Sequence, residues 1–584
     1  MFRAQVQQAL CPGDRGQEPV SIIVEAGAKA TPKRTQLRVL VFVLAAALPA
    51  VAGQLGRDLL PPDDLREAEI AREMWAGGDY VVPRFAGLPF VEKPPGFQAV
   101  VASAYAWSGG PTTDAARAVT AGFALLTLVA VFMLGKDALG VEGAGLAVAF
   151  LGLSSRFCRT AHTVLLDNAL TAALAFALLF LWRGLGQRDL RAKERAYTAA
   201  AFALGISFLF KGFVGPVLFA TGSLTYLAAT RRFGELRSAL RPLPIAAFLL
   251  PVLCWVVPFV EQASPDLVRE FFIQNHFGRV FVGYASNVRP FYFYALDLWR
   301  AFLPSAALLP FAAFSAFRKR HTAGGGAGIF FLSFALGPLL FLSLSKAKDS
   351  VYALPVYPAL ALLVATWCEE KLELRGWWVR KGTEASGFAA CAAGSAAIGA
   401  TVFFGGFSWS VALAIGALAS LAIALLWLLR QGDLRSVCAA SAGLFALAWS
   451  LWFTGPLEKR EVGRRSIREP VEAALAIAGD RTVLLLDPSD GLRGASSFWR
   501  NRTAEEVPDA ASFARRLLED PNAVGLFHMP ARDGFLEYVR SAFTQVGAQP
   551  VLEAALPAGE NRVVLLWGAR PAGAARSYAS SASE

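Results

Sequence analysis

Long apolar runs recur along most of the chain, from residue 37 to residue 454. Inside lipid every backbone polar group must be bonded within its own segment, so repeated runs of this kind predict membrane-spanning helices. We expect about 13 spans, although several of the runs are shorter than the roughly 20 residues that cross a hydrocarbon core. They lie near residues 37–55, 115–134, 142–155, 163–182, 196–210, 213–230, 242–261, 291–316, 326–344, 351–368, 384–406, 408–429 and 435–454.

Two segments depart from this pattern. The run at 97–109 is short for a crossing, and we expect an interfacial helix there. After residue 457 the composition becomes charged, and short strand-like and helix-like stretches alternate, which predicts a small α/β domain with a largely parallel sheet. The strand-like stretches are 482–487, 523–527 and 562–567, and the helix-like stretches are 470–478, 508–519 and 533–543.

The predicted fold class is a polytopic α-helical membrane protein with amphipathic juxtamembrane helices in its first external loop. Lys33, Arg34 and Arg38 precede the first span, so the N-terminus should face the cytoplasm. An odd number of spans then places the C-terminal domain on the external side. We expect a cytoplasmic tail over 1–36, a transmembrane domain over 37–456, an external (periplasmic) α/β domain over 457–570 and a disordered tail over 571–584.

Composition agrees with the membrane class and argues against nucleic acid as a partner. Only 17% of the residues are charged and the mean hydropathy is +0.45, whereas soluble domains carry about 25% charged residues. The net charge of +11 does not indicate nucleic-acid binding, because the basic residues cluster in short loops between spans, as the positive-inside rule expects. Six scattered cysteines without a CxxC pair indicate neither a disulfide framework nor a zinc site.

The first external loop is unusually acidic for a connection between two spans. Pro61-Pro62 followed by Asp63 or Asp64 predicts the start and cap of a helix, and Gly77-Gly78 ends it. The loop holds seven acidic residues, Asp58, Asp63, Asp64, Glu67, Glu69, Glu73 and Asp79, and an eighth, Glu92, follows beside Lys93. Capping and a solvated face would explain an ordinary acidic loop. Opposite charges on Arg66, Arg84 and Lys93, in a segment fixed by prolines, favour a polar-ligand site at the membrane surface.

Ionisable groups recur near the same predicted face. They are His162 and Asp167 at the start of a span, Lys211 between two apolar runs, His276 and Arg279, and Lys346, Lys348 and Tyr352 in a later loop. A lysine near a span end can also snorkel to the surface, and a lone histidine is more often structural than catalytic. Several such groups on one face are harder to explain in that way.

Carboxylates, cations and lipid contact on one face together suggest a lipid-phosphate sugar as ligand. Lysine and arginine suit a phosphate headgroup, and they can stabilise the charge that develops on an anionic phosphate leaving group. Carboxylates suit sugar hydroxyls or the activation of an attacking group as general base. The lipid tail would stay between the helices while the phosphate and the sugar lie at the external surface.

The motifs resemble those of the GT-C membrane glycosyltransferases, specifically the group holding aminoarabinose transferases and protein O-mannosyltransferases. The first loop reads DDLREAEIAREM from Asp63, then GDYVVP from Gly78, then EKPP from Glu92. Asp167, Lys211-Gly212-Phe213, the stretch from His276 to Arg279 and Ser345-Lys-Ala-Lys through Pro355 follow in the family's order. Two positions depart from the family pattern. Asp64 stands where glutamate is usual, and Glu67 stands where tyrosine is usual, so the resemblance supports the reaction class better than the substrate.

The resemblance implies an inverting transfer of a sugar from a polyprenyl-phosphate donor to an acceptor on the periplasmic face of the bacterial inner membrane. The implied catalytic residues are Asp63, Glu92 and Lys93. The implied contacts to donor phosphate are Lys93, Lys211, Arg279, Lys346 and Lys348. The implied sugar and acceptor contacts are Asp64, Arg66, Glu69, Arg84, His162, Asp167, His276 and Tyr352. The acceptor would be lipid A or a related envelope glycan, or else a protein Ser/Thr hydroxyl.

Two alternatives and one cofactor question stay open. A transporter or lipid flippase would place charges near the bilayer midplane and show inverted repeats, and the sequence shows neither. A silent scaffold relative would not need to retain Asp63, Lys93 and Lys211. No cofactor is indicated with certainty: a divalent ion could bind among Asp63, Asp64 and Glu92, although their spacing forms no dedicated cage.

Overall fold

The computed structural model describes residues 33–282, 287–322, 326–374, 376–405, 409–431, 433–529, 535–558 and 563–571. The packing of the chain divides it into two units. We call the first the membrane unit; it comprises Met1–Leu55, Val91–Phe97 and Arg117–Lys459. The second, the α/β unit, comprises Gly56–Phe90, Gln98–Ala116 and Arg460–Glu584. The sequence-based domain limits describe order along the chain rather than packing, and they stay a prediction.

The membrane unit is built almost entirely of helices. Its α-helices are α2 (Lys33–Val51), α5 (Thr113–Gly152), α6 (Ser155–Ala161), α7 (Leu166–Leu185), α8 (Leu190–Lys211), α9 (Val214–Thr230), α10 (Glu235–Ala239), α11 (Pro242–Gln262), α12 (Pro265–Arg269), α13 (Phe293–Ala301), α14 (Leu309–Arg318), α15 (Gly326–Leu344), α16 (Tyr357–Leu374), α17 (Trp377–Gly405), α18 (Trp409–Gln431) and α19 (Leu434–Thr454). A π-helix, η1 (Glu270–Val282), and two 3₁₀ helices, η2 (Ser305–Leu308) and η3 (Ser350–Val356), complete it.

The helices confirm a multi-pass membrane architecture. Among the described residues, 9 helices are long and apolar enough to cross a membrane, and Val214–Thr230 and Ser305–Arg318 are shorter apolar helices. α5 contains two of the predicted spans, because Gly140 breaks it with φ +83° and ψ 177°. A Cβ on Gly135 would lie 2.9 Å from Cα of Ala144, so the chain doubles back at Gly140. The number of crossings stays a prediction.

One predicted span has a different form in the structure. The run at 291–316 is not one helix but three pieces, α13, η2 and α14. Pro304 and Pro310 lie at the junctions, and proline lacks the N–H that a continuous helix needs. The hydropathy of the run is continuous, so periodicity alone could not show the interruption.

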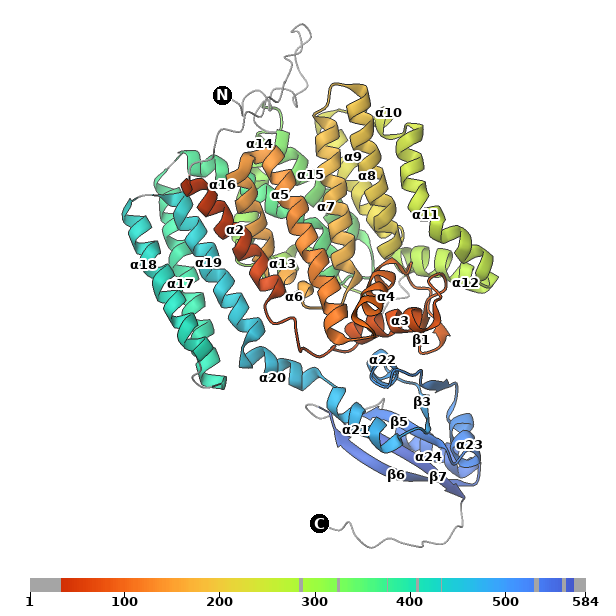
Figure 1. The fold of residues 1–584 in the computed structure, drawn as a ribbon. Helices are drawn as coiled ribbons and strands as arrows, with labels where there is room; N and C mark the ends of the chain where they lie inside the picture. The colour runs from red at the N-terminus through yellow and green to blue at the C-terminus, as the bar shows by residue number, and fades with distance from the viewer. Residues whose placement is uncertain are drawn as a thin grey trace. The chain divides into compact units, whose positions relative to one another are not determined.

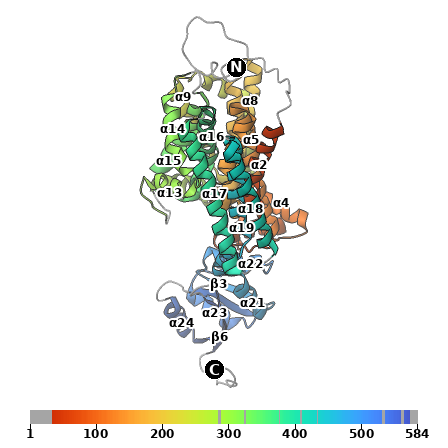
Figure 2. The same ribbon diagram turned by 90° about the vertical axis from the view of Figure 1, so that its left-hand side faces the viewer.

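Neighbouring helices of the membrane unit pack side by side. In Figure 1, α7, α8 and α9 stand next to one another, and α8 packs against both α7 and α11. Figure 2, turned by 90°, keeps α17, α18 and α19 together, which agrees with their mutual contacts. α19 also packs on α2, the first helix of the unit.

Charged residues between these helices are paired. Arg435 donates from Nη1 to Glu142 at 2.7 Å and bonds Glu369 through both Nη1 and Nη2, at 2.8 and 2.9 Å. Arg38 reaches the same Glu142 at 2.5 Å. Unpaired charges between packed apolar helices would be costly. The network therefore joins α2, α5, α16 and α19 at a low electrostatic cost.

The α/β unit contains the expected sheet, with a mixed rather than largely parallel topology. Its elements are α3 (Asp63–Gly77), β1 (Arg84–Phe85), β2 (Leu88–Pro89), most of α4 (Gly96–Ser108), most of α20 (Pro456–Arg465), α21 (Arg468–Ala478), β3 (Thr482–Leu486), α22 (Asp490–Phe498), β4 (Glu505–Val507), α23 (Ala510–Glu519), β5 (Ala523–Met529), α24 (Phe535–Gln545), β6 (Ala548–Pro557) and β7 (Val563–Pro571). The strand order is β4-β3-β5-β7-β6. β3 pairs in parallel with β4 and β5, whereas β7 runs antiparallel to β5 and β6. β6 and β7 are consecutive, and a short connection permits only antiparallel neighbours.

The first loop packs on this sheet domain. Helix α3 lies against α22, and a Cβ on Gly494 would come within 2.9 Å of the Leu65 carbonyl oxygen. Arg468 bonds Asp58 at 3.0 Å, and the Tyr105 and Phe498 rings lie 6.4 Å apart. The acidic loop and the C-terminal domain therefore form one packed body, although some 400 residues separate them in the sequence (408 between Ser466 and Asp58).

Candidate active site

A buried ion pair joins the start of one membrane helix to the end of the next. Lys211, the last residue of α8, donates from Nζ to Oδ1 of Asp167 at 2.5 Å. The two side chains are only 9% and 5% exposed. Gly212 follows α8 with φ +60°, a conformation that favours glycine. The helix therefore ends at Lys211. Sequence reasoning singled out both charges, and the structure shows that they are partners.

An aromatic ring completes this group. The ammonium of Lys211 lies 4.5 Å from the ring centroid of Tyr352, within the range of a cation–π interaction. Tyr352 belongs to η3, whose first turn is capped by the Asp349 carboxylate, which accepts from the Val351 N–H at 3.0 Å. We call Asp167, Lys211 and Tyr352 the lysine cluster. One N–H of the ammonium is used by Asp167, so the others can donate to an anion.

Further polar residues hold η3 in place. Ser350 donates to Oδ2 of Asp297, and Arg156 donates to Ser350 at 2.5 Å. Arg300 bonds the same Asp297 carboxylate at 3.0 Å. These residues come from α6, α13 and η3, and sequence reasoning missed Arg156, Asp297 and Ser350. A carboxylate within the otherwise apolar 291–316 run was the signal available for Asp297.

The turn that carries Glu92 and Lys93 is fixed against α8. Both residues are half-buried, and Pro94 and Pro95 separate them from the start of α4. Gly96 packs so closely on α8 that a Cβ there would lie 2.6 Å from the Leu209 carbonyl oxygen. The Phe97, Phe123 and Phe210 rings continue the contact, with centroids 6.3 and 5.4 Å apart. The turn is therefore anchored two residues before Lys211.

Replacing Gly96 with alanine should destabilise the protein. The added methyl group would meet backbone atoms that cannot rotate away, and overpacking of this kind costs about 1–3 kcal/mol. Gly122→Ala is the matched control, since Gly122 is a helical glycine with nothing within 4 Å of an added Cβ. We expect the thermal midpoint of purified Gly96→Ala to fall and that of Gly122→Ala to stay or rise. A Gly96→Ala variant as stable as the unchanged protein would contradict the close approach.

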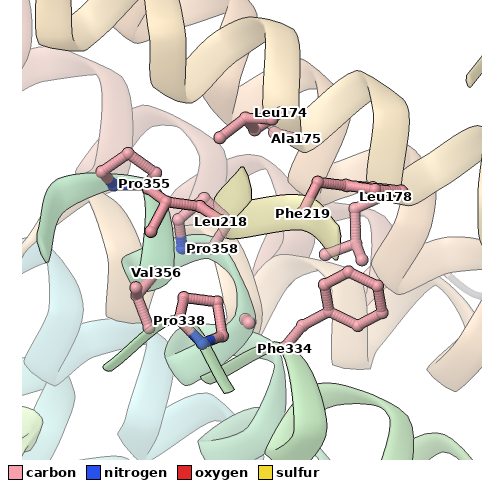
Figure 3. A pocket seen from close by; sticks show the side chains of 11 residues that line it. Leu174, Ala175, Leu178, Leu218, Phe219, Phe334, Pro338, Pro355, Val356 and Pro358 are labelled. Carbon is pink, nitrogen blue, oxygen red and sulfur yellow. The ribbon is translucent and has the colours of Figure 1, made fainter. Parts of the chain in front are cut away.

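An apolar cavity lies along the same elements. Figure 3 shows its lining, which comes from α7, α9, α15, η3 and α16 and is entirely apolar. The cavity has a volume of about 20 Å³, close to the room for one water molecule. Leu174, Leu218 and Pro355 line it, and each follows a cluster residue by three to seven positions. The lysine cluster thus lies where charged groups meet an apolar interior.

The remaining predicted residues of the membrane unit have varied surroundings. Lys348 is buried and donates from Nζ to the carbonyls of Arg289, at 2.9 Å, and Ser345, so its ammonium binds backbone. Lys346 is exposed in the same loop. His162 is buried, stacks on Phe453 with centroids 3.9 Å apart and contacts the Pro49 carbonyl at 2.7 Å. The side chains of His276 and Arg279, in η1, lie outside the described ones. Asn275 of η1 donates to the Val91 carbonyl at 3.2 Å.

In the α/β unit, Asp63 and Arg66 lie in the first turn of α3. Arg66 donates from Nη2 to Asp63 at 2.7 Å and also bonds Glu67 and Asp490, at 3.2 Å each. The Asp63 side chain is 43% exposed, the Arg66 side chain 13%. One guanidinium therefore connects the candidate catalytic carboxylate to α22 of the C-terminal domain.

Three other acidic residues of α3, Asp64, Glu67 and Glu69, are buried. The expected N-terminal cap is not made by Asp63 or Asp64: Pro62 occupies the cap position, and Asp64 accepts instead from the Leu60 N–H at 3.1 Å. Glu67 is buried and accepts from Gln98 at 2.5 Å. Glu69 is fully buried and accepts two bonds of 2.7 Å from Arg72. Burial raises the pKa of the Glu69 carboxyl to about 8, against the opposing attraction of Arg72.

Arg84, in β1, is exposed and donates to the Gly87 carbonyl at 3.2 Å. Within the described ranges, no three acidic, histidine or cysteine side chains gather as metal ligands would. Arg72, which sequence reasoning missed, follows Glu69 by three positions, a spacing that places the two on one helix face.

The architecture is similar to a membrane-protein fold already solved in another chain. ArnT from Cupriavidus metallidurans, solved bound to undecaprenyl phosphate, matches 91% of this chain and 96% of its own length, with a TM-score of 0.68 and 22% identity. The same protein in the apo state gives a TM-score of 0.67. The fold predicted from the motifs is confirmed.

Sequence comparisons point to the same group. Residues 92–259 match the family model described as dolichyl-phosphate-mannose-protein mannosyltransferase. A protein of Edwardsiella ictaluri named undecaprenyl phosphate-alpha-4-amino-4-deoxy-L-arabinose arabinosyl transferase is 32% identical over 316 residues, which cover 54% of this chain and 56% of the relative. The protein of that name from Pseudomonas aeruginosa gives the same values. The chain thus spans about half the length of the curated relatives it matches, and the resemblance to aminoarabinose transferases is confirmed.

Proposed function

We propose that this protein transfers a sugar from a polyprenyl-phosphate donor to an acceptor of the cell envelope, with inversion at the anomeric carbon. The observation that carries the proposal is the lysine cluster, a buried ammonium held by a carboxylate and an aromatic ring where the apolar interior begins. A phosphate with a long apolar tail suits this place, because the phosphate can bond the ammonium while the tail contacts the apolar interior. The active site would face the periplasm at the bacterial inner membrane.

The chemistry requires one bond to form as another breaks. An acceptor oxygen attacks the anomeric carbon on the face opposite the phosphate, and the bond from that carbon to the phosphate oxygen breaks. The phosphate leaves with the bonding electrons, and Lys93 and Lys211 would stabilise its added negative charge. Asp167 and Tyr352 would hold the Lys211 ammonium in place. The apolar residues beside the lysine cluster would keep water from the donor.

The part of Asp63 depends on the acceptor. A hydroxyl acceptor must lose its proton, and the partly exposed Asp63 carboxylate would take it as general base. A phosphate acceptor is already anionic, so Asp63 would then orient charged groups and take no proton. Arg66 would position Asp63 in either case.

We assign roles to the other predicted residues as follows, and Lys348 and Glu69 receive new roles from the bonds that they make. Glu92, Arg279 and Lys346 are proposed to contact donor or acceptor, and Asp64, His162 and His276 to shape the site. Lys348 is proposed to fix its own loop through two carbonyls, and Glu69 to hold Arg72.

The named relatives supply the first substrate to test. Their names specify an undecaprenyl phosphate donor carrying 4-amino-4-deoxy-L-arabinose. We propose a donor of this chemical class and lipid A or a related glycan as acceptor. Transfer to protein Ser/Thr is the second candidate, because the matching family model is named for protein mannosylation.

An in vitro assay separates these proposals. Purified protein is incubated with undecaprenyl-phosphate aminoarabinose or polyprenyl-phosphate mannose, and with lipid A or a Ser/Thr-rich peptide, and products are resolved by mass spectrometry. We expect one donor and acceptor pair to give a glycosylated product and free polyprenyl phosphate. Movement of intact donor across a vesicle membrane, without cleavage, would instead support a flippase. Mass spectrometry of envelope glycans from a deletion strain should show the loss of one modified species.

A further inference from the structure

A second cavity, whose lining includes charged residues, lies wholly within the α/β unit. It has a volume of about 420 Å³, within the range of small-molecule sites. The end of α3, the β1–β2 turn and one residue of the C-terminal domain form its walls. The lining residues are Arg72, Glu73, Met74, Ala76, Gly77, Asp79, Val82, Arg84, Gly87 and Thr503.

The most informative lining residue is Arg72, because it is almost completely buried yet not fully bonded. Its side chain is 4% exposed. Nε and Nη2 donate to Glu69, and Nη2 also reaches the Thr503 hydroxyl at 3.4 Å. Nη2 also lies 3.9 Å from Oε1 of Glu73, and within the described ranges the bonds of Arg72 are made by Nε and Nη2 and not by Nη1. A buried guanidinium with a spare donor at a cavity wall indicates a ligand that accepts hydrogen bonds.

The two carboxylates of the cavity stabilise its walls. Glu73 accepts from the Gly87 N–H at 2.9 Å, and Asp79 accepts from the Val81 and Val82 N–H groups at 2.9 and 3.0 Å. Gly87 has φ +80°, and a Cβ there would lie 3.3 Å from the Thr503 methyl group. The first loop and the C-terminal domain thus meet closely at this point. Each carboxylate retains lone pairs that can accept from a ligand.

The charges around the cavity select the ligand chemistry. A simple anion would face Glu73, Asp79 and the negative end of the α3 dipole. A simple cation would face the guanidiniums of Arg72 and Arg84. A polyhydroxyl compound meets both kinds of wall, because each hydroxyl donates to a carboxylate or carbonyl and accepts from a guanidinium or from Thr503. No aromatic side chain lines the cavity, so a nucleobase would have nothing to stack on.

We propose that this cavity binds a saccharide unit, as a site separate from the transfer chemistry. Arg72 follows Asp63 by nine positions on α3, which places the two about 13 Å apart along the helix axis. The saccharide is held by Arg72, Arg84 and Thr503 as donors and by Glu73 and Asp79 as acceptors. It is either a free sugar or the headgroup of a glycolipid, since both present the same hydroxyls.

The test is direct binding to the full-length protein in nanodiscs of phosphatidylethanolamine and phosphatidylglycerol. Maltoside detergents are excluded because their headgroup is a sugar. Saturation-transfer NMR with glucose, glucosamine and glucuronate should show at least one saturable sugar, with a Kd below about 10 mM. Inorganic phosphate and Mg²⁺ alone should not compete with it. Displacement of the sugar by phosphate or Mg²⁺, or saturable binding of no sugar in the panel, would overturn the proposal.

Matched variants locate the site. Arg84→Gln and Thr503→Val alter exposed residues and should weaken sugar binding about fivefold or more, the effect of one lost hydrogen bond. Arg516→Gln is the control, an equally exposed arginine of the same unit that pairs with Glu505 outside the cavity. Equal losses in Arg84→Gln and Arg516→Gln would place the sugar elsewhere.

Two further arms separate this site from the transferase proposal and identify the sugar's source. Binding should persist in the double variant Asp167→Asn with Lys211→Met, whatever that variant does in the transfer assay. Its loss there would show that the sugar occupies the transfer site, contrary to the proposal. Monogalactosyl diacylglycerol in the nanodisc should displace the free sugar if a glycolipid headgroup is the ligand. No displacement supports a free saccharide at the same site.

Discussion

Replacing both members of the buried pair, Asp167→Asn with Lys211→Met, is expected to recover the thermal stability that either single replacement loses, and to leave the protein without transferase activity. Each single change strands one buried charge, which costs about 3–5 kcal/mol. The double change removes both charges, and neutral replacements of a buried pair are often tolerated. Thermal midpoints and single-turnover transfer rates of the four proteins form the double-mutant cycle.

The cycle distinguishes a structural pair from a catalytic one. If Lys211 only stabilises the fold, the stable double variant regains activity. If Lys211 stabilises the leaving phosphate, the double variant is folded and inactive. Lys193 with Glu235 gives a matched control pair, since it too joins two elements of the membrane unit through one ammonium, at 3.1 Å, away from the lysine cluster. Its charge-neutral double variant should keep the transfer rate.

Replacing Asp63 with asparagine is expected to lower kcat by about 10²- to 10⁴-fold with a hydroxyl acceptor, the usual contribution of a general base. The change keeps the size of the side chain and loses only the charge. Folding should be little affected, because the Asp63 side chain is 43% exposed and Arg66 keeps its bonds to Glu67 and Asp490. Initial rates over a range of acceptor concentrations provide kcat and KM separately.

Asp58→Asn provides the control for the same loop. Asp58 also pairs with an arginine, Arg468, but it lies before α3 and is assigned no part in transfer. We expect its kcat to be unchanged. With a phosphate acceptor, Asp63→Asn should affect KM more than kcat, because no proton has to be removed. Full turnover by Asp63→Asn with every acceptor would exclude Asp63 from the mechanism.

Local patterns predicted the elements better than their pairing. Apolar runs located most membrane helices, and Gly140 separates the two spans expected at 115–134 and 142–155. The interruption of the 291–316 run and the antiparallel β7 were not predicted. Pro304 and Pro310 interrupt the first and the short β6–β7 connection sets the second, and neither signal is part of the apolar pattern from which the elements were predicted.

In the candidate site, too, single residues were predicted but their contacts were not. Asp167 and Lys211 were singled out as ionisable groups beside apolar runs, and Tyr352 as part of the loop that carries Lys346 and Lys348. Their meeting in one cluster was not predictable from spacing, since they come from three elements. Glu67, an unexplained departure from the family motif, proved to be paired with Gln98 within the α/β unit.

The sequence by itself determined the membrane class, the order of the motifs and the reaction type they resemble, because hydropathy and local residue chemistry suffice for these. Only the tertiary structure decided which charges are partners. The bonds from Arg66 to Asp490 and from Arg72 to Thr503 span 424 and 431 residues. No local pattern encodes such contacts, because they form only when α3 packs on the C-terminal domain and leaves a buried arginine facing a cavity.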